Sequence, residues 1–225
     1  SFESEAAPVD RLLAAWGRAH RFAGSKARAA VAARVYALLR RRRSLAWGLP
    51  DASARAAAIG LARAEGLDPE TVFSGERHAP AALTAAERAA LAEPAPPPPD
   101  AVRLDYPDWL DGPLRESLGS AFESAMGALR DRAPVDLRAN LIRTTPEGAA
   151  AALAEDGVET ASCGHAATCL RAAPGAPIAR SRAYVEGLVE PQDAASQAAA
   201  DFAEAAPGET VLDFCAGGGG KALAL

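Results

Sequence analysis

Residues 211–225 read VLDFCAGGGGKALAL, and this stretch decides the fold class that we expect for the chain. The short apolar run at 210–214 predicts a strand, and the four consecutive glycines at 217–220 predict a tight turn. A helix is expected from Lys221 onward. A strand, a glycine-rich turn and a helix in this order are typical of the cofactor sites of doubly wound α/β folds.

The spacing of this stretch separates it from two common glycine-rich motifs. Asp213 is followed by Gly217 and Gly219 in the pattern D-x-x-x-G-x-G, which differs from the G-x-G-x-x-G of dinucleotide-binding proteins. Lys221 is followed by Ala222, so the hydroxyl that holds magnesium in a P-loop is missing. The spacing therefore disfavours both a nicotinamide-dependent enzyme and a P-loop protein.

The same stretch resembles the cofactor-binding motif of the RsmB/Sun family of RNA 5-methylcytosine methyltransferases, which reads V-L-D-x-C-A-x-P-G-G-K-T. It departs from that motif at Gly218, where proline is usual, and at Ala222, where threonine is usual. The glycine is expected to loosen the turn, and the alanine removes a hydroxyl from the start of the helix. The matching residues are Val211, Leu212, Asp213, Cys215, Ala216, Gly219, Gly220 and Lys221.

Three further stretches agree with that family in the same order. Residues 187–197 (GLVEPQDAASQ) resemble its G-x-x-x-x-Q-D-x-x-S-Q segment. Residues 137–140 (LRAN) are similar to its R-x-N element, which lies in a small RNA-recognition-like subdomain. Residues 21–28 (RFAGSKAR) resemble the start of its NusB-like helical domain, with alanine at position 27 where aspartate is common. The resemblance therefore runs along most of the chain.

The resemblance implies an S-adenosylmethionine-dependent methyltransferase that forms 5-methylcytosine in RNA, with ribosomal RNA as the expected substrate. In the family a cysteine thiolate adds to C6 of cytosine, which activates C5 toward the methyl group, and a second cysteine assists release. Both are expected after Leu225, so we expect no catalytic residue in this chain and no activity from residues 1–225 alone. The residues expected to bind the cofactor are Cys215, Ala216, Gly217, Gly218, Gly219, Gly220 and Lys221.

The resemblance and the hydrophobic pattern together predict a multi-domain fold. An all-α, NusB-like, RNA-binding bundle is expected over 1–93, where apolar residues recur at helical spacing. A proline-rich linker and a connecting helix are expected over 94–133. A small α/β, RRM-like subdomain follows over 134–176, and 177–225 begins a Rossmann-like methyltransferase domain.

Local signals predict several helix boundaries. Asp68 and Thr145 each precede a proline and therefore predict N-caps, and Thr84 opens a T-x-x-E capping box. Gly24 suits the residue after a helix end, and Ser25 suits the N-cap of the next helix.

The second half of the chain mixes strand and helix signals. Residues 135–142 (VDLRANLI) alternate apolar and polar side chains and predict a strand. Residues 183–189 are expected to be extended. A helix is expected over 194–205 with Asp193 as its N-cap.

The charge distribution points to a polyanionic partner. The chain has a net charge of −5, yet residues 1–50 carry ten Lys/Arg and three Asp/Glu. Such asymmetry favours RNA binding by the front of the chain. The alternative is a solvated helix end whose arginines complement the helix dipole, or, for the strand residues, pairing with local carboxylates. The expected RNA-binding residues are Arg21, Lys26, Arg28, Arg40, Arg41, Arg138 and Asn140.

Other classes of protein are disfavoured by composition. No apolar run reaches the length of a transmembrane helix, and no signal peptide pattern is present. Cys163, Cys169 and Cys215 have neither zinc-site spacing nor a disulfide framework. We therefore expect a cytoplasmic, monomeric protein without metal or membrane partners. The main rival function is a non-catalytic RNA-binding or assembly protein with a vestigial methyltransferase motif.

Overall fold

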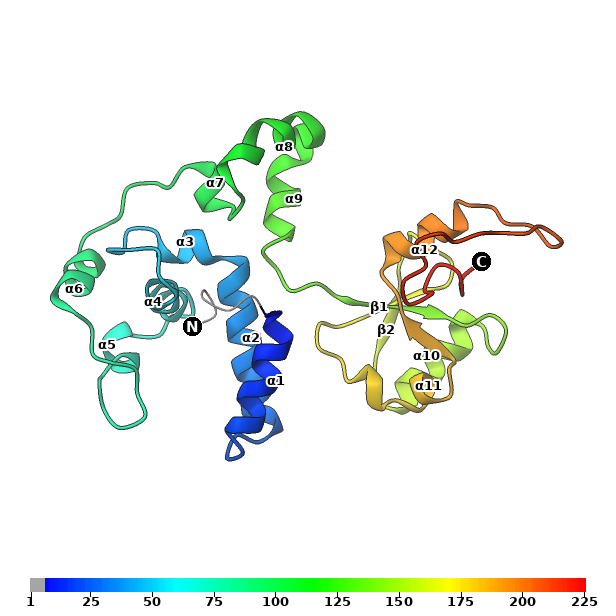
Figure 1. The fold of residues 1–225 in the computed structure, drawn as a ribbon, viewed down its shortest axis with the longest axis horizontal. Helices are drawn as coiled ribbons and strands as arrows, with labels where there is room; N and C mark the ends of the chain where they lie inside the picture. The colour runs from blue at the N-terminus through cyan, green and yellow to red at the C-terminus, as the bar shows by residue number, and fades with distance from the viewer. Residues whose placement is uncertain (1–6) are drawn as a thin grey trace. The chain divides into compact units, whose positions relative to one another are not determined.

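The computed structural model describes residues 7–225, which divide into two compact units. One unit ends at Arg132, and the other runs from Ala133 to Leu225. The first unit is built of helices, and the second contains the sheet (Figure 1). Within this described part of the chain, no helix is both long enough and apolar enough to cross a membrane.

Helices and connecting turns make up the described part of the first unit. The helices are α1 (Val9–Ala19), α2 (Ser25–Arg40), α3 (Arg42–Ala46), α4 (Ala54–Ala64), α5 (Pro69–Val72), α6 (Ala85–Ala92), α7 (Asp100–Arg103), η1 (Asp108–Leu110), α8 (Asp111–Leu118), η2 (Gly119–Ala121) and α9 (Phe122–Ala128). The prediction of a helical N-terminal region is thus confirmed, whereas its likeness to NusB stays a prediction.

Two predicted N-caps of this unit form, and a third lies one residue away. Asp68 accepts a hydrogen bond from the Glu70 amide at 3.1 Å, and Thr84 and Glu87 form a complete capping box. At α2 the N-cap is Gly24, and Ser25 is already helical. The prediction of Ser25 as N-cap was therefore wrong by one residue, because the extended backbone of the turn ends at the glycine.

Helix α4 approaches α3 closely because Gly60 has no side chain. A Cβ atom added to Gly60 would lie 1.8 Å from the carbonyl oxygen of Leu45 on α3. Ala57 and Ile59 of α4 are fully buried near this contact. The alanine-rich sequence thus builds a core by close helix packing rather than with large side chains.

The proline-rich stretch 94–99 forms no helix or strand before α7, as its composition predicted. The carbonyl oxygen of Pro96 accepts a hydrogen bond from the Trp47 indole at 2.7 Å. Beyond it, Tyr106, Phe122 and Met126 form a small separate core. The connection is therefore tied to the helical unit at Trp47.

The second unit is built on a four-stranded antiparallel sheet with the strand order β2-β3-β1-β4. Leu137 of β1 lies opposite Leu170 of β3 and Pro191 of β4. The elements are β1 (Val135–Ala139), α10 (Pro146–Glu155), β2 (Thr160–Ser162), β3 (Cys169–Ala172), η3 (Ile178–Arg180), α11 (Arg182–Val185), β4 (Val189–Pro191) and α12 (Ala194–Asp201).

Helices cover both faces of this sheet. Helices α10 and α11 lie on one face and α12 on the other (Figure 1). Because side chains alternate along a strand, Leu137 faces the apolar core with Leu153 of α10, whereas Asp136 and Arg138 face the α12 side. The α12 side of the sheet is therefore the polar one.

Helix α10 has the boundaries that the sequence predicts. Thr145 accepts a hydrogen bond from the Gly148 amide at 3.1 Å, and Pro146 is the first helical residue. Gly157 follows the helix with a φ of +75°, a conformation that favours glycine. Asp193 likewise caps α12, as expected.

Three predictions in this unit gave the wrong residue range for an element. Strand β1 stops at Ala139 instead of continuing to residue 142, because the Asn140 side chain accepts from the Ile142 amide at 3.1 Å and turns the chain. Residues 183–189 contain the helical turn α11 and reach strand conformation only at Val189. Helix α12 ends at Asp201 rather than at residue 205.

The predicted strand at 210–214 and the helix from Lys221 do not form in this structure. Leu212 and Phe214 are 83% and 90% exposed. A buried strand needs neighbouring strands on which to complete its hydrogen bonds, and the described sheet offers this segment none. The Rossmann-like start of this region therefore stays a prediction.

Candidate functional site

The polar side of the sheet carries a carboxylate with both oxygens engaged. Arg171 on β3 donates to the two oxygens of Asp136 at 2.7 and 2.9 Å, and the Ala194 amide donates at 3.2 Å. The Arg171 guanidinium holds the pKa of Asp136 below its ordinary value. Asp136 therefore joins β1, β3 and the start of α12.

Arg138, next on this side of β1, is a buried cation that is 8% exposed. It forms an ion pair with Glu190 on β4 and donates to the carbonyl oxygen of Leu223 at 3.0 Å. Burial lowers the pKa of its guanidinium below the ordinary value. Arg138 thus links the sheet to the C-terminal segment.

The Q-D-x-x-S-Q segment builds the start of α12. Gln197 donates to the carbonyl oxygen of Gln192 at 2.9 Å and accepts from the Thr168 hydroxyl at 3.0 Å. The side-chain amide of Gln192 is buried, and neither of its polar atoms has a partner among the described residues. Gln197 therefore has a structural role, whereas the side-chain amide of Gln192 keeps unused hydrogen-bonding groups.

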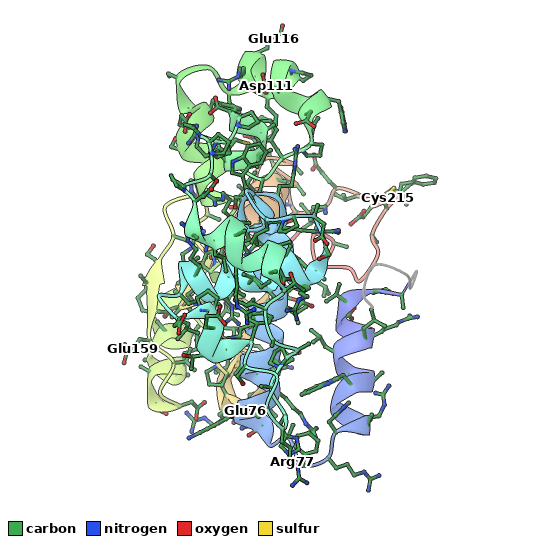
Figure 2. The ribbon with its side chains drawn as sticks, turned by 90° about the vertical axis from the view of Figure 1, so that its left-hand side faces the viewer. Glu76, Arg77, Asp111, Glu116, Glu159 and Cys215 are labelled. Atoms are coloured by element: carbon green, nitrogen blue, oxygen red, sulfur yellow. The ribbon has the colours of Figure 1, made fainter. Side chains whose placement is uncertain are left out.

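The predicted cofactor residues lie together in an irregular turn. Gly217 and Gly219 have φ values of +55° and +84°, which residues with side chains rarely adopt. The side chain of Cys215 is exposed on the open C-terminal segment (Figure 2). Lys221 is also exposed. The turn runs beside the Gln192 amide, whose Nε2 atom would lie 3.7 Å from a Cβ atom at Gly220.

The types of residue in and around this turn suit the binding of a polar ligand. The Oδ2 atom of Asp213 is buried without a partner in the described part of the chain, as is the Gln192 amide. A Cβ atom added at Gly217 or Gly218 would meet nothing within 4 Å, so the backbone there is open. These groups offer the hydrogen bonds and the free backbone that a cofactor such as S-adenosylmethionine requires.

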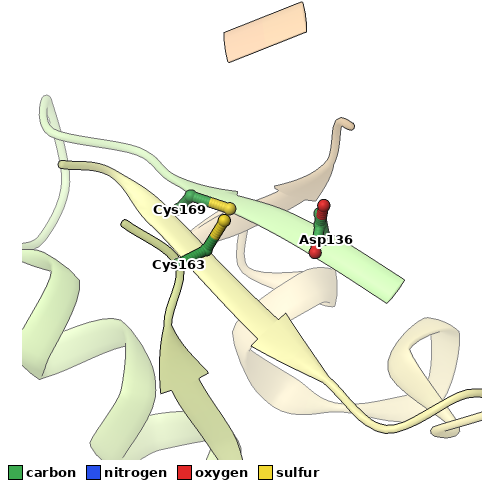
Figure 3. A group of neighbouring side chains, drawn as sticks. All are labelled: Asp136, Cys163 and Cys169. Atoms are coloured by element: carbon green, nitrogen blue, oxygen red, sulfur yellow. The ribbon is translucent and has the colours of Figure 1, made fainter. Parts of the chain in front are cut away.

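Two cysteines and Asp136 form a compact group on the α12 side. One ligand atom of each residue lies within 4.8 Å of the other two, and Figure 3 shows the two sulfur atoms pointing toward one another. Burial raises the pKa of Cys169 to about 12, whereas metals bind the thiolate. Since Asp136 is also bonded to Arg171, the group fits packing against Ala194 better than metal binding.

The predicted basic residues fall at opposite ends of α2. Arg21, Lys26 and Arg28 are exposed near its start. Arg40 donates to the carbonyl oxygen of Arg130 at 3.3 Å near its end, beside the half-buried Arg41. A helix rises 1.5 Å per residue, so the two groups are about 20 Å apart. They do not form one compact patch.

Asn140 is engaged within the second unit. Its side-chain amide donates to the carbonyl oxygen of Gly187 at 3.0 Å, and its oxygen accepts from the Ile142 amide. Together with the contacts of Arg138, this gives the R-x-N element a role in holding the fold. Sequence reasoning missed that role because the partners lie 47 and 85 residues away.

Comparison with known proteins gives this domain a family. A model of the ferredoxin-like domain of RsmF/B-like methyltransferases matches residues 106–179, which include β1, α10, β2 and β3. The ferredoxin-like domain of this chain belongs to the RsmF/B-like family. The resemblance to the RsmB/Sun family noted in the sequence is thereby confirmed.

Several bacterial relatives agree with this assignment. Ribosomal RNA small subunit methyltransferase B of Pseudomonas putida is 32% identical over 124 residues, which cover 55% of this chain and 28% of that protein. The Xanthomonas campestris protein of the same name is 33% identical over 120 residues, covering 53% and 28%. The chain therefore matches little more than a quarter of the length of these relatives.

A solved structure shares the fold. The crystal structure of PH0851 matches with a TM-score of 0.65 and 21% identity, over 92% of this chain and 54% of that one. At this level of identity the likeness concerns the fold alone.

Proposed function

We propose that this chain is part of an S-adenosylmethionine-dependent methyltransferase that forms 5-methylcytosine in ribosomal RNA. The observation that carries the proposal is the match of residues 106–179 to a model of the ferredoxin-like domain, since these residues include three of the four strands of the antiparallel sheet. The names of the bacterial relatives support RNA methylation. The choice of cytosine C5 rests on the sequence resemblance.

S-adenosylmethionine would supply the methyl group when bound. We propose that the backbone of residues 215–221 holds it, with the open peptide groups of Gly217 and Gly218 toward the ligand. The unpartnered polar atoms of Asp213 and Gln192 would add hydrogen bonds. Arg138 would act indirectly, by holding Leu223 in place through its hydrogen bond to the carbonyl oxygen.

The covalent step proposed for the family needs a thiolate that adds to C6 of cytosine. None of the three cysteines in this chain suits that role. Cys163 and Cys169 are buried, and Cys215 lies within the proposed cofactor segment. We therefore assign the chain to binding and positioning rather than to the covalent chemistry.

The basic residues of the helical unit are proposed to bind RNA phosphates. Arg21, Lys26 and Arg28 would form one contact, and Arg40 with Arg41 a second about 20 Å away. For Arg138 and Asn140 we propose internal support in place of RNA contact, because the terminal nitrogens of Arg138 and the side-chain amide of Asn140 bond within the unit. A cytoplasmic, monomeric protein is part of the same proposal.

A second candidate function is RNA binding or assembly without catalysis. It is favoured by the absence of a strand and a helix around the glycine turn in the described residues, and by Gly218 in place of proline. Calorimetric titration of S-adenosylmethionine into the protein as the cell makes it discriminates the two. Methyltransferase function predicts saturable binding, and no binding at millimolar ligand would favour the second candidate.

A matched pair of variants sharpens that titration. Gly219→Ala should weaken binding, because Gly219 has a φ of +84° that alanine adopts only with strain. Gly164→Ala is the control, since its φ lies outside that range and an added Cβ would meet nothing within 4 Å. Equal loss of binding in both variants would argue against the glycine turn as the binding element.

A further inference from the structure

The turn between α1 and α2 carries a series of three aromatic rings with an exposed end. The rings of Trp16 and His20 stack with centroids 4.8 Å apart and planes 19° apart. The Phe22 ring meets His20 edge-on at 5.7 Å and is itself 86% exposed. A large apolar ring is thus presented to solvent at the end of an aromatic series.

Hydrogen bonds fix the backbone that presents Phe22. The Ala23 amide donates to the carbonyl oxygen of His20 at 3.0 Å, and Arg28 donates to that of Ala23 at 2.7 Å. The Nδ1 atom of His20 lies 2.9 Å from the Trp16 carbonyl oxygen, which can only accept, so Nδ1 carries the hydrogen. Ala23 is 4% exposed, so the residue next to Phe22 is anchored.

The stretch of sequence around Phe22 carries cations that have no ion-pair partner in the described part of the chain. Residues 11–50 contain ten Lys/Arg and no Asp or Glu. Within the described part of the chain, Arg34 pairs with Glu65 and Arg43 with Asp108. By contrast, three exposed cations within four residues of Phe22 in the sequence have no ion pair or hydrogen bond there; these are Arg18, Arg21 and Lys26.

We propose that Phe22 is a stacking platform for an unpaired nucleobase of RNA, with Arg18, Arg21 and Lys26 neutralising the flanking phosphates. The proposal rests on RNA being the partner in the proposed function, and it adds the form of RNA that this end of α2 binds. Bases in a duplex already stack on one another, so a ring at a turn reaches only single-stranded RNA. Stacking of this kind tolerates any base.

The charge of the sequence around Phe22 favours RNA over a protein or a membrane as the partner. A protein or membrane partner would be met by a contiguous apolar patch, whereas Phe22 is one exposed ring in a cationic stretch of the sequence. Aromatic rings set in a basic surface are the arrangement by which proteins bind single-stranded nucleic acid without reading its sequence. Single-stranded RNA is a polyanion with exposed planar bases, so it matches both the exposed ring and the positive charge.

The test is fluorescence anisotropy with a labelled single-stranded RNA of about ten nucleotides and a duplex of the same length. Phe22→Ala should weaken binding of the single strand on the order of tenfold, and Phe22→Trp should retain it. The slope of log Kd against log salt should stay unchanged in Phe22→Ala, because stacking releases no counterions. Arg21→Gln should instead reduce that slope by about 0.7.

Phe202→Ala is the matched control. Phe202 is 88% exposed, like Phe22, but it lies between Asp201 and Glu204 in the second unit. Its replacement should leave RNA binding unchanged. Because both phenylalanines are exposed, neither variant should alter the circular dichroism or the thermal unfolding of the chain.

The outcomes separate this proposal from the proposed function. Wild-type affinity in Phe22→Ala, or equal binding of duplex and single strand with the same dependence on Phe22, would overturn the stacking platform alone. Failure of the wild-type chain to bind either RNA would overturn both the platform and the RNA-binding role of the helical unit. Weaker single-strand binding in Phe22→Ala with an intact salt slope would support the platform.

Discussion

The guanidinium of Arg138 donates a hydrogen bond at 3.0 Å to the carbonyl oxygen of Leu223, 85 residues farther along the chain. This contact joins strand β1 of the ferredoxin-like sheet to the segment that follows the glycine turn. The same guanidinium is paired with Glu190 and is almost completely buried. An arginine of the R-x-N element is therefore hydrogen-bonded to the chain two residues after the proposed cofactor segment.

Replacing Arg138 should release that segment. In Arg138→Met, Glu190 loses its partner and Leu223 loses its donor, so the free energy of unfolding should fall by about 2 kcal/mol. Hydrogen–deuterium exchange should become faster at the amides of Leu223 and Leu225, which bond within the turn. Arg180→Met, an exposed arginine of the same unit, is the control. Unchanged exchange at these amides in Arg138→Met would contradict the support role.

Acid should weaken the helical unit through Glu87. Its carboxylate accepts from Arg55 at 2.8 Å, and this bond with the capping box lowers the pKa of Glu87 to about 2 from 4.5. A lowered folded-state pKa means that the ionised group stabilises fully above about pH 4.5 and that this contribution is lost as the pH falls toward 2.

Glu87→Gln should remove that pH dependence while keeping an acceptor for the cap. Urea unfolding followed by far-ultraviolet circular dichroism should show the variant about 1 kcal/mol less stable at neutral pH and equal to wild type near pH 2. Glu76→Gln, at an exposed glutamate, should have no such effect. A constant difference between Glu87→Gln and wild type at every pH would show that the charge of Glu87 is not responsible.

The three thiols should differ sharply in reactivity. Cys215 is exposed, whereas Cys163 and Cys169 are buried and the pKa of Cys169 is raised to about 12. A disulfide reagent such as DTNB should therefore modify one thiol quickly in the folded chain and all three after denaturation. Cys215→Ser should abolish the fast phase. Two fast thiols in the folded wild type would mean that the cysteine group beside Asp136 is open to solvent.

Residues 1–225 alone should transfer no methyl group. The proposed chemistry needs a nucleophilic thiolate, and the cysteines present are either buried or part of the cofactor segment. Incubation of the purified chain with tritiated S-adenosylmethionine and ribosomal RNA should leave the RNA unlabelled. Labelling above a heat-inactivated control would place the nucleophile among Cys163, Cys169 and Cys215.

Features set by neighbouring residues could be predicted from the sequence. The caps at Asp68, Thr84, Thr145 and Asp193 formed where expected, since each depends on a side chain reaching an amide two or three residues away. The small α/β subdomain expected over 134–176 also followed from motifs and alternation, whereas its ferredoxin-like character came from the family comparison. These signals act between neighbouring residues, so contacts with distant parts of the chain did not override them.

Features set by distant partners could not be predicted from the sequence. The apolar run at 210–214 has the composition of a buried strand, but strand formation requires neighbouring strands that composition does not reveal. The burial of Arg138 depends on Glu190 and Leu223, so an exposed RNA contact looked equally reasonable from the sequence. The exposure of Phe22 likewise depends on how the α1–α2 turn is anchored by Arg28.

The central claim is methylation of ribosomal RNA at cytosine C5. Bisulfite sequencing of small-subunit ribosomal RNA, from source cells with the gene intact, disrupted and restored, tests it most directly. The proposed function predicts that one 5-methylcytosine disappears on disruption and returns on restoration. An identical methylation pattern in all three strains would contradict the claim.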